Sequence, residues 1–124
     1  DKIRRQFMKN MIFEMKQPLP EDTDKNGVVY IGNTTFFYLQ NELNHGHETV
    51  IITSRQAEIL RMLVDNANSM VPRKSMLEEV WGDDFYSNSL ALNVQITYLR
   101  RALKSDTSVI IETVIGKYIL KANI

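Results

Sequence analysis

The chain has no cysteine, and only 3 of its 124 residues are proline and 5 are glycine. The lack of cysteine excludes disulfide bonds, thiol catalysis and cysteine-ligated metal sites, and it fits a reducing cytoplasm. No apolar run approaches the roughly 20 residues that a membrane-spanning helix needs. No signal-peptide pattern follows Asp1. We therefore expect a cytoplasmic protein without membrane association.

The chain also lacks a net charge, because 15 basic residues balance 15 acidic ones. The distribution is uneven, with a balance of +3 over residues 1–16, −4 over 17–69 and +1 over 70–124. Between residues 90 and 104 the charged residues are Arg100, Arg101 and Lys104, with no carboxylate among them. A local basic patch of this kind is what contact with phosphate requires, whatever the net charge.

An apolar content of 44% and a charged content of 24% are ordinary for one globular domain with a real core. Residues 3–15 have apolar side chains at helical spacing, and the polar stretch KQPLPEDTDKNG follows them. We expect residues 1–27 to be the end of a preceding element plus a linker. We expect residues 28–124 to form the domain.

Four short β-type runs between residues 28 and 52 predict a four-stranded antiparallel sheet: VVYI, TFFYL, the turn-containing NELNHGHE, and TVII. Thr53 then begins a helix as N-cap, and Gln56 completes a capping box. Pro72 suits the first turn of a second helix, which Gly82 ends.

A third helix is predicted over about residues 89–104, since Leu92, Ile96, Leu99 and Leu103 form one apolar stripe. Two strand-like runs, VIIETVI and YILKA, follow it. Gly116–Lys117 between them predicts a type II′ hairpin turn. The predicted fold class is α+β, a winged helix-turn-helix with an N-terminal four-stranded antiparallel sheet, three helices and a C-terminal β-hairpin wing over about residues 110–121.

Four segments occur in this order: ITSRQAEILRML, VPRKSMLEEVWG, LNVQITYLRRAL and IETVIGKYIL. With the sheet before them, they resemble the C-terminal effector domain of OmpR/PhoB-type response regulators over roughly residues 28–121. The resemblance implies sequence-specific binding of double-stranded DNA and transcription regulation as the output domain of a two-component system. It implies no enzymatic activity and no cofactor.

The resemblance also implies partners. Residues 1–27 would be a receiver-domain remnant and linker, and a sensor histidine kinase would act through that receiver. Two copies would form a dimer on DNA, while the isolated domain would be monomeric. RNA polymerase would contact the loop after the second helix, at Asp83, Asp84, Phe85 and Tyr86.

The third helix would be the recognition helix in the major groove, and the wing would lie over the minor groove. The base contacts that the resemblance implies are Ala91, Asn93, Val94 and Tyr98. The phosphate contacts that it implies are Trp81, Gln95, Thr97, Arg100 and Thr113. Side-chain chemistry adds Arg101 as a phosphate contact and Lys117 as the charged residue at the wing tip. Asparagine suits a bidentate contact with adenine, and valine suits the methyl group of thymine.

The chain departs from the family pattern at its recognition helix and wing. Leu90 and Ala91 stand where the family usually has arginine and serine or threonine, and Asn93 replaces the usual aspartate. Tyr98 occupies an often basic position. The wing has Ile115 in place of arginine and one glycine fewer. These departures predict weaker non-specific affinity, and they keep one alternative open: a winged-helix module for protein–protein contact with little or no DNA binding.

Two small clusters invite other interpretations. The sequence HGH at residues 45–47 has two imidazoles, but it lacks a third metal ligand and is more typical of a turn. The pair Asp83–Asp84 resembles a carboxylate pair for acid–base catalysis, but no histidine or lysine partner accompanies it. We expect neither a metal site nor a catalytic site.

Overall fold

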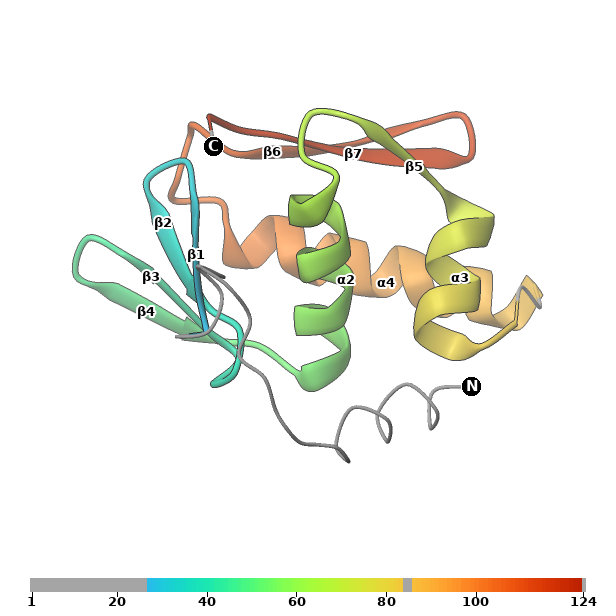
Figure 1. Cartoon of the computed structure of the whole chain (residues 1–124), viewed down its shortest axis with the longest axis horizontal. Coiled ribbons are helices and arrows are strands. Elements are labelled where there is room, and N and C mark those ends of the chain that lie inside the picture. The colour runs from blue at the N-terminus through green and yellow to red at the C-terminus, as the bar shows by residue number, and fades with distance from the viewer. Residues whose placement is uncertain (1–26, 84–85, 124) are drawn as a thin grey trace, which may run out of the picture.

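The computed structural model describes residues 27–83 and 86–123. Two small sheets flank three helices, and the element order confirms the predicted winged helix-turn-helix plan (Figure 1). The expected remnant and linker, apart from Gly27, lie outside the described residues, as do Asp84 and Phe85. In chain order the elements are β1 (Val28–Ile31), β2 (Thr34–Phe37), β3 (Glu42–His45), β4 (Glu48–Ile51), α2 (Ser54–Asp65), β5 (Met70–Pro72), α3 (Arg73–Trp81), α4 (Tyr86–Ala102), β6 (Ile110–Val114) and β7 (Lys117–Lys121).

The first sheet is the predicted antiparallel meander, with strand order β1-β2-β3-β4. Its register pairs Ile31 with Thr34 and His45 with Glu48, so two-residue turns join these strands. The second strand is shorter than the predicted TFFYL, because the chain turns after Phe37 and returns at Glu42. Side chains alternate between the two faces, and those of Phe36 and Leu43 point into the core.

Helix α2 begins as predicted from the capping box. The Gln56 backbone N–H donates to Thr53 Oγ1 at 3.1 Å, and the Thr53 N–H donates to Gln56 Oε1 at 2.9 Å. These two bonds satisfy donors that the first helical turn leaves without partners. The helix ends at Asp65, with Asn66 as its C-cap.

The second sheet has three strands in the order β5-β7-β6, and its strand β5 was not predicted. Pro72, which the sequence placed in the first turn of a helix, is the last residue of β5 and the N-cap of α3. A proline is compatible with this place because β5 is an edge strand and Pro72 lies at its end. Gly82 ends α3 as predicted, with the left-handed φ of 89° that favours glycine.

The predicted hairpin turn at Gly116–Lys117 is wrong by one residue. Val114 pairs with Lys117, so the turn residues are Ile115 and Gly116, with φ angles of 27° and 72°. Two positive φ angles belong to a type I′ rather than a type II′ turn. Lys117 is therefore the first residue of the central strand β7 and not the tip of the wing.

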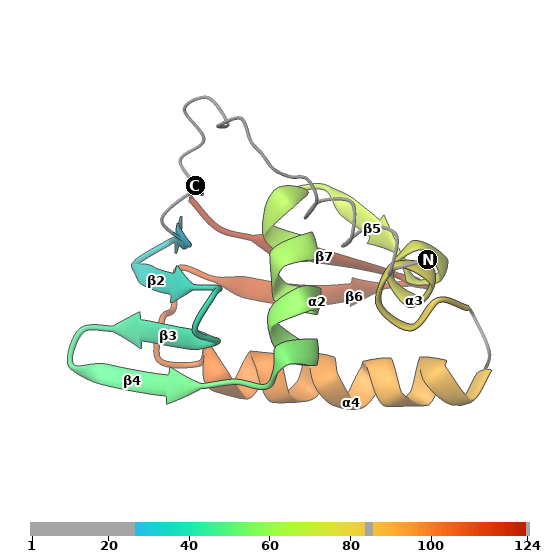
Figure 2. The same ribbon diagram turned by 60° about the horizontal axis from the view of Figure 1, so that its bottom comes forward.

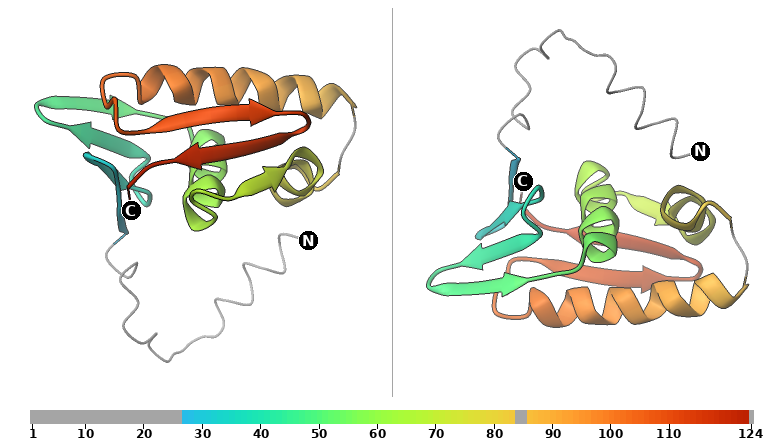
Figure 3. Two further views of the ribbon diagram at one scale, coloured as in Figure 1. Left: turned by 90° about the horizontal axis from the view of Figure 1, so that it is seen from above. Right: turned by 90° about the horizontal axis from the view of Figure 1, so that it is seen from below.

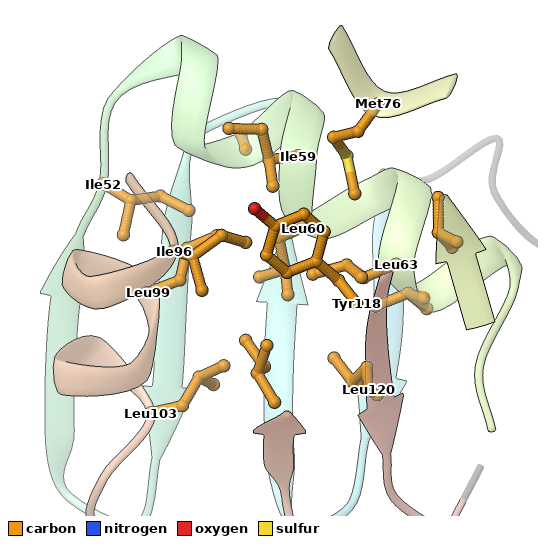
Figure 4. Packing of buried hydrophobic residues seen from close by; sticks show 14 of the residues in the cluster. Ile52, Ile59, Leu60, Leu63, Met76, Ile96, Leu99, Leu103, Tyr118 and Leu120 are labelled. Atoms are coloured by element: carbon orange, nitrogen blue, oxygen red, sulfur yellow. The ribbon is translucent and has the colours of Figure 1, made fainter. Parts of the chain in front are cut away.

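One hydrophobic core joins both sheets and all three helices (Figure 4). Leu60 and Leu63 of α2, Ile96 and Leu99 of α4, and Tyr118 of β7 are all at most 1% exposed. Helix α2 contacts β7 and crosses in front of β6 and β7 in Figure 2, with β2, β3 and β4 to its left, and α4 runs along the bottom of that view. Helix α4, the predicted recognition helix, and the β6–β7 hairpin, the predicted wing, thus share one packed core.

Asp106 lies in the loop between α4 and β6, and its hydrogen bonds connect this loop to the β1–β2 turn of the first sheet. Its carboxylate accepts hydrogen bonds from Thr34 Oγ1 at 2.6 Å, from the Asn33 N–H at 2.9 Å and from the Ser108 N–H at 3.0 Å. Burial by itself raises the pKa of Asp106, but the bonds from Ser108, Thr34 and Asn33 outweigh it and hold the pKa below its ordinary value.

Candidate nucleic-acid interface

Helix α4 begins at Tyr86, three residues before the predicted start at Ser89, and ends at Ala102. Its apolar stripe is confirmed, since Leu92, Ile96, Leu99 and Leu103 are at most 4% exposed. Strand β6 lies beside α4, and the β6–β7 turn lies at the same end of the molecule as the N-terminal half of α4 (Figure 3). The helix and the wing tip therefore flank one end of the domain.

The outer side of α4 carries several of the side chains that are predicted to contact DNA. Five of them are exposed and lie on the side away from the core: Asn93, Val94, Thr97, Tyr98 and Arg101. Large apolar groups are among them, with Val94 47% and Tyr98 45% exposed. The Arg101 guanidinium lies 5.5 Å from the centroid of the Tyr98 ring. Ala91, the remaining predicted base contact, is half-buried.

The side chain of Asn93 is hydrogen-bonded to strand β7 of the wing. The hydroxyl of Tyr118 in β7 donates to Asn93 Oδ1 at 2.6 Å. A buried tyrosine hydroxyl needs such a partner, and here the partner is an exposed residue of α4. The Asn93 side chain is therefore positioned by the core.

Gln95, a predicted phosphate contact, is hydrogen-bonded to helix α2. Gln56 Nε2 donates to Gln95 Oε1 at 2.9 Å, which joins the N-terminus of α2 to the middle of α4. Thr97, also a predicted phosphate contact, donates through its hydroxyl to the Asn93 carbonyl at 3.0 Å. Within the described part of the chain, the amide nitrogen of Gln95 has no hydrogen-bond partner and can act as a donor.

Arg100 and Thr113, both predicted to contact phosphate, contact each other. Arg100 Nη2 donates to Thr113 Oγ1 at 2.9 Å, and Arg100 Nε donates to the Ile111 carbonyl at 2.8 Å. Both side chains are exposed. The pair thus joins α4 to β6 at the surface that flanks the helix.

The wing and α3 are also connected. The Arg73 N–H donates to the Gly116 carbonyl at 2.8 Å, so the first residue of α3 holds the wing turn. Trp81 is the last residue of α3 and is half-buried, with the Arg55 guanidinium 4.6 Å from its ring centroid. Lys117 is exposed beside the turn.

The acidic loop is described only in part. Asp83 accepts a hydrogen bond from Asn88 Nδ2 at 2.6 Å, which joins the loop to the first turns of α4. Asp84 and Phe85 lie outside the described residues, and of Tyr86 only its place at the start of α4 is described. The predicted contact of this loop with RNA polymerase stays a prediction.

Within residues 27–83 and 86–123, no group of three or more histidine or acidic side chains could hold a metal ion. His45 ends β3 and His47 belongs to the turn after it, as the sequence pattern indicated. The same residues contain no helix long and apolar enough to cross a membrane.

The sequence did not point to the residues that hold this surface in place. The capping box identifies Gln56 only as part of a helix cap, and no local pattern singles out Tyr118, yet each of them binds a side chain of α4. No local pattern could have identified these pairs, because the partners are 25 and 39 residues apart in the chain.

Comparison with known proteins agrees with the geometry. The family model "Transcriptional regulatory protein, C terminal" matches residues 46–117. Response regulator MprA of Mycobacterium tuberculosis is 32% identical over 92 residues, which are 74% of this chain and 40% of that protein. Transcriptional regulatory protein RprY of Bacteroides fragilis is 34% identical over 93 residues, 75% of this chain and 39% of that protein. The chain thus spans about two fifths of the length of these curated relatives.

Among solved structures, the C-terminal domain of the nisin resistance regulator NsrR, a lantibiotic response regulator, is similar with a TM-score of 0.64. The two are 27% identical, and the likeness covers 77% of this chain and 98% of that one. The matched family consists of transcription-regulator domains and is not an enzyme family, in agreement with the expectation from the sequence. The chain belongs to the family of C-terminal domains of transcriptional regulatory proteins.

Proposed function

We propose that this domain binds double-stranded DNA with sequence preference and regulates transcription, with α4 in the major groove and the β6–β7 wing at the minor groove. One observation carries the proposal. Helix α4 presents an exposed face of donors and apolar groups, it contains no carboxylate, and it lies beside a β-hairpin at one end of the domain. An outer face without carboxylates does not repel the phosphates that line the major groove.

The exposed side chains divide into two roles under this proposal. Ala91, Asn93, Val94 and Tyr98 face base edges, where amide donors and apolar groups distinguish one base from another. The residues proposed to hold phosphates are Trp81, Gln95, Thr97, Arg100, Arg101 and Thr113. Lys117 beside the wing turn is proposed to lie near the minor groove, where negative potential concentrates.

We also infer the wider setting from the named relatives. MprA is called a response regulator, and both MprA and RprY are longer than this chain, so residues 1–27 are proposed to be the end of a receiver domain and a linker. A sensor histidine kinase would phosphorylate that receiver, two copies would then bind adjacent half-sites, and the protein would be cytoplasmic. The loop from Asp83 to Tyr86 is the proposed contact with RNA polymerase.

A salt titration with two variants tests the proposal. The domain should bind random duplex DNA at low salt, and its affinity should fall steeply as salt rises. Arg101→Ala should weaken binding to every duplex by a similar factor and reduce the salt slope by about one. Lys121→Ala removes the same charge from a residue paired with Glu112 at 3.0 Å near the other end of β7, and should change binding less.

The alternative, a winged-helix module for protein contact, makes the opposite prediction. No affinity for any duplex at low salt, in a protein that unfolds cooperatively, would contradict DNA binding and favour protein–protein contact. Equal losses for Arg101→Ala and Lys121→Ala would contradict the placement of α4 against the phosphates.

A further inference from the structure

The contact between Tyr118 and Asn93 joins the centre of the core to the surface of α4. Tyr118 is 1% exposed, and Figure 4 shows its ring among Leu60, Leu63 and Ile96. The backbone of Tyr118 is held on both sides, because it pairs with Val71 in β5 and Thr113 in β6. Both the ring and its hydroxyl are therefore fixed in position.

This fixed hydroxyl selects one orientation of the Asn93 side chain. The phenol donates to Oδ1 at 2.6 Å, a short distance for a neutral hydrogen bond. A carboxamide that binds through its oxygen must point its –NH2 group elsewhere. Asn93 is exposed, and among the described residues its Nδ2 has no hydrogen-bond partner. The group left for the groove is thus a hydrogen-bond donor.

We propose that Tyr118 is a positioning residue for sequence recognition, which holds Asn93 with its Nδ2 donor facing the base edges. This inference rests on the proposed DNA binding. In the major groove, purines offer N7 as an acceptor, guanine adds O6, and thymine offers O4. Cytosine offers only its N4 amino group, which is a donor. The base that Asn93 contacts is therefore a purine or thymine, and cytosine is rejected there because two donors would meet.

Selection of binding sites from random duplexes tests the inference, with the wild type compared with four variants. The wild type should disfavour cytosine at one position by about tenfold. Asn93→Ala should abolish that discrimination at this position alone. Tyr118→Phe should reduce it several-fold at the same position, while affinity for random DNA stays unchanged.

Two further variants separate positioning from mere structure. Asn93→Asp retains the oxygen that accepts from Tyr118 but replaces the donor with an acceptor, so preference at this position should change towards cytosine. Adding Tyr118→Phe to Asn93→Ala should have no further effect on discrimination, because Tyr118 acts through Asn93. Thermal unfolding of each variant verifies that the protein tested is folded.

The outcomes keep the two proposals distinct. If the wild type binds no duplex, DNA binding itself fails. If the wild type selects a site and folded Tyr118→Phe retains full discrimination, only the role of Tyr118 is overturned. Selection of cytosine by the wild type, or a loss of discrimination spread over many positions in Tyr118→Phe, would also overturn it.

Discussion

At the scale of single residues, Ile115 is the least expected side chain in the domain. It has a positive φ of 27°, although a β-branched residue strongly disfavours that region. It is also 93% exposed, so packing does not compensate for the strain. The residue occupies the first position of a type I′ turn, where asparagine is favoured.

Replacement of Ile115 by asparagine should therefore stabilise the domain. The expected gain in the free energy of unfolding is about 1 kcal/mol, the scale of the penalty for a left-handed non-glycine residue. Urea unfolding measures it. Ile51→Asn is the matched control, because Ile51 is 68% exposed but lies in strand β4, where isoleucine is favoured. A loss of stability in both variants would show that Ile115 is not strained.

At the scale of elements, the orientation of α4 relative to the wing depends on a few side-chain bonds. Arg100 joins the helix to both Ile111 and Thr113 of β6, and Tyr118 joins β7 to Asn93. Neighbouring Arg101 instead lies over Tyr98 on the same helix. Arg100 thus connects α4 to β6, whereas the adjacent Arg101 contacts a residue of its own helix.

Arg100→Ala should destabilise the domain where Arg101→Ala does not. Loss of two hydrogen bonds from a charged but exposed donor should lower the free energy of unfolding by about 1–2 kcal/mol. Amide exchange should increase first in β6, next to the lost bonds. The adjacent Arg101→Ala serves as the control, with an expected change within about 0.5 kcal/mol. Equal stability of the two variants would show that the bonds of Arg100 do not hold the wing.

At the scale of the whole molecule, the β1–β2 turn of the first sheet lies in close contact with the loop between α4 and β6. Gly32 begins the β1–β2 turn with a φ of 58°, and its N–H donates to the Asn123 carbonyl at 3.2 Å. A Cβ placed there would collide with Ser108 Oγ and lie 2.8 Å from Val109 Cγ2. Both the backbone and the packing therefore require glycine, next to the bonds of Asp106.

Gly32→Ala should consequently lower the free energy of unfolding by about 2–4 kcal/mol, through backbone strain and overpacking together. Gly46 isolates the backbone effect, because its φ is 63° and no atom lies within 4 Å of an added Cβ. Gly46→Ala should cost only about 1 kcal/mol. Denaturant unfolding of both variants compares them. Similar losses would show that the turn is not packed against the loop.

The elements of this domain were largely determined by its sequence alone, because their signals are local. The capping box of Thr53 and Gln56, the stripe from Leu92 to Leu103 and the terminating Gly82 each act over a few residues, and all were confirmed. The exposure of Asn93, Val94, Thr97, Tyr98 and Arg101 followed from helical spacing for the same reason.

Only the tertiary structure decided what depends on partners distant in the chain. Strand β5 has three residues and exists because β7 supplies its hydrogen bonds, and the same sheet register places the wing turn at Ile115–Gly116. The orientation of Asn93 depends on Tyr118, and that of Gln95 on Gln56. A local pattern can place a side chain on a face, but the groups that orient it are brought there by folding.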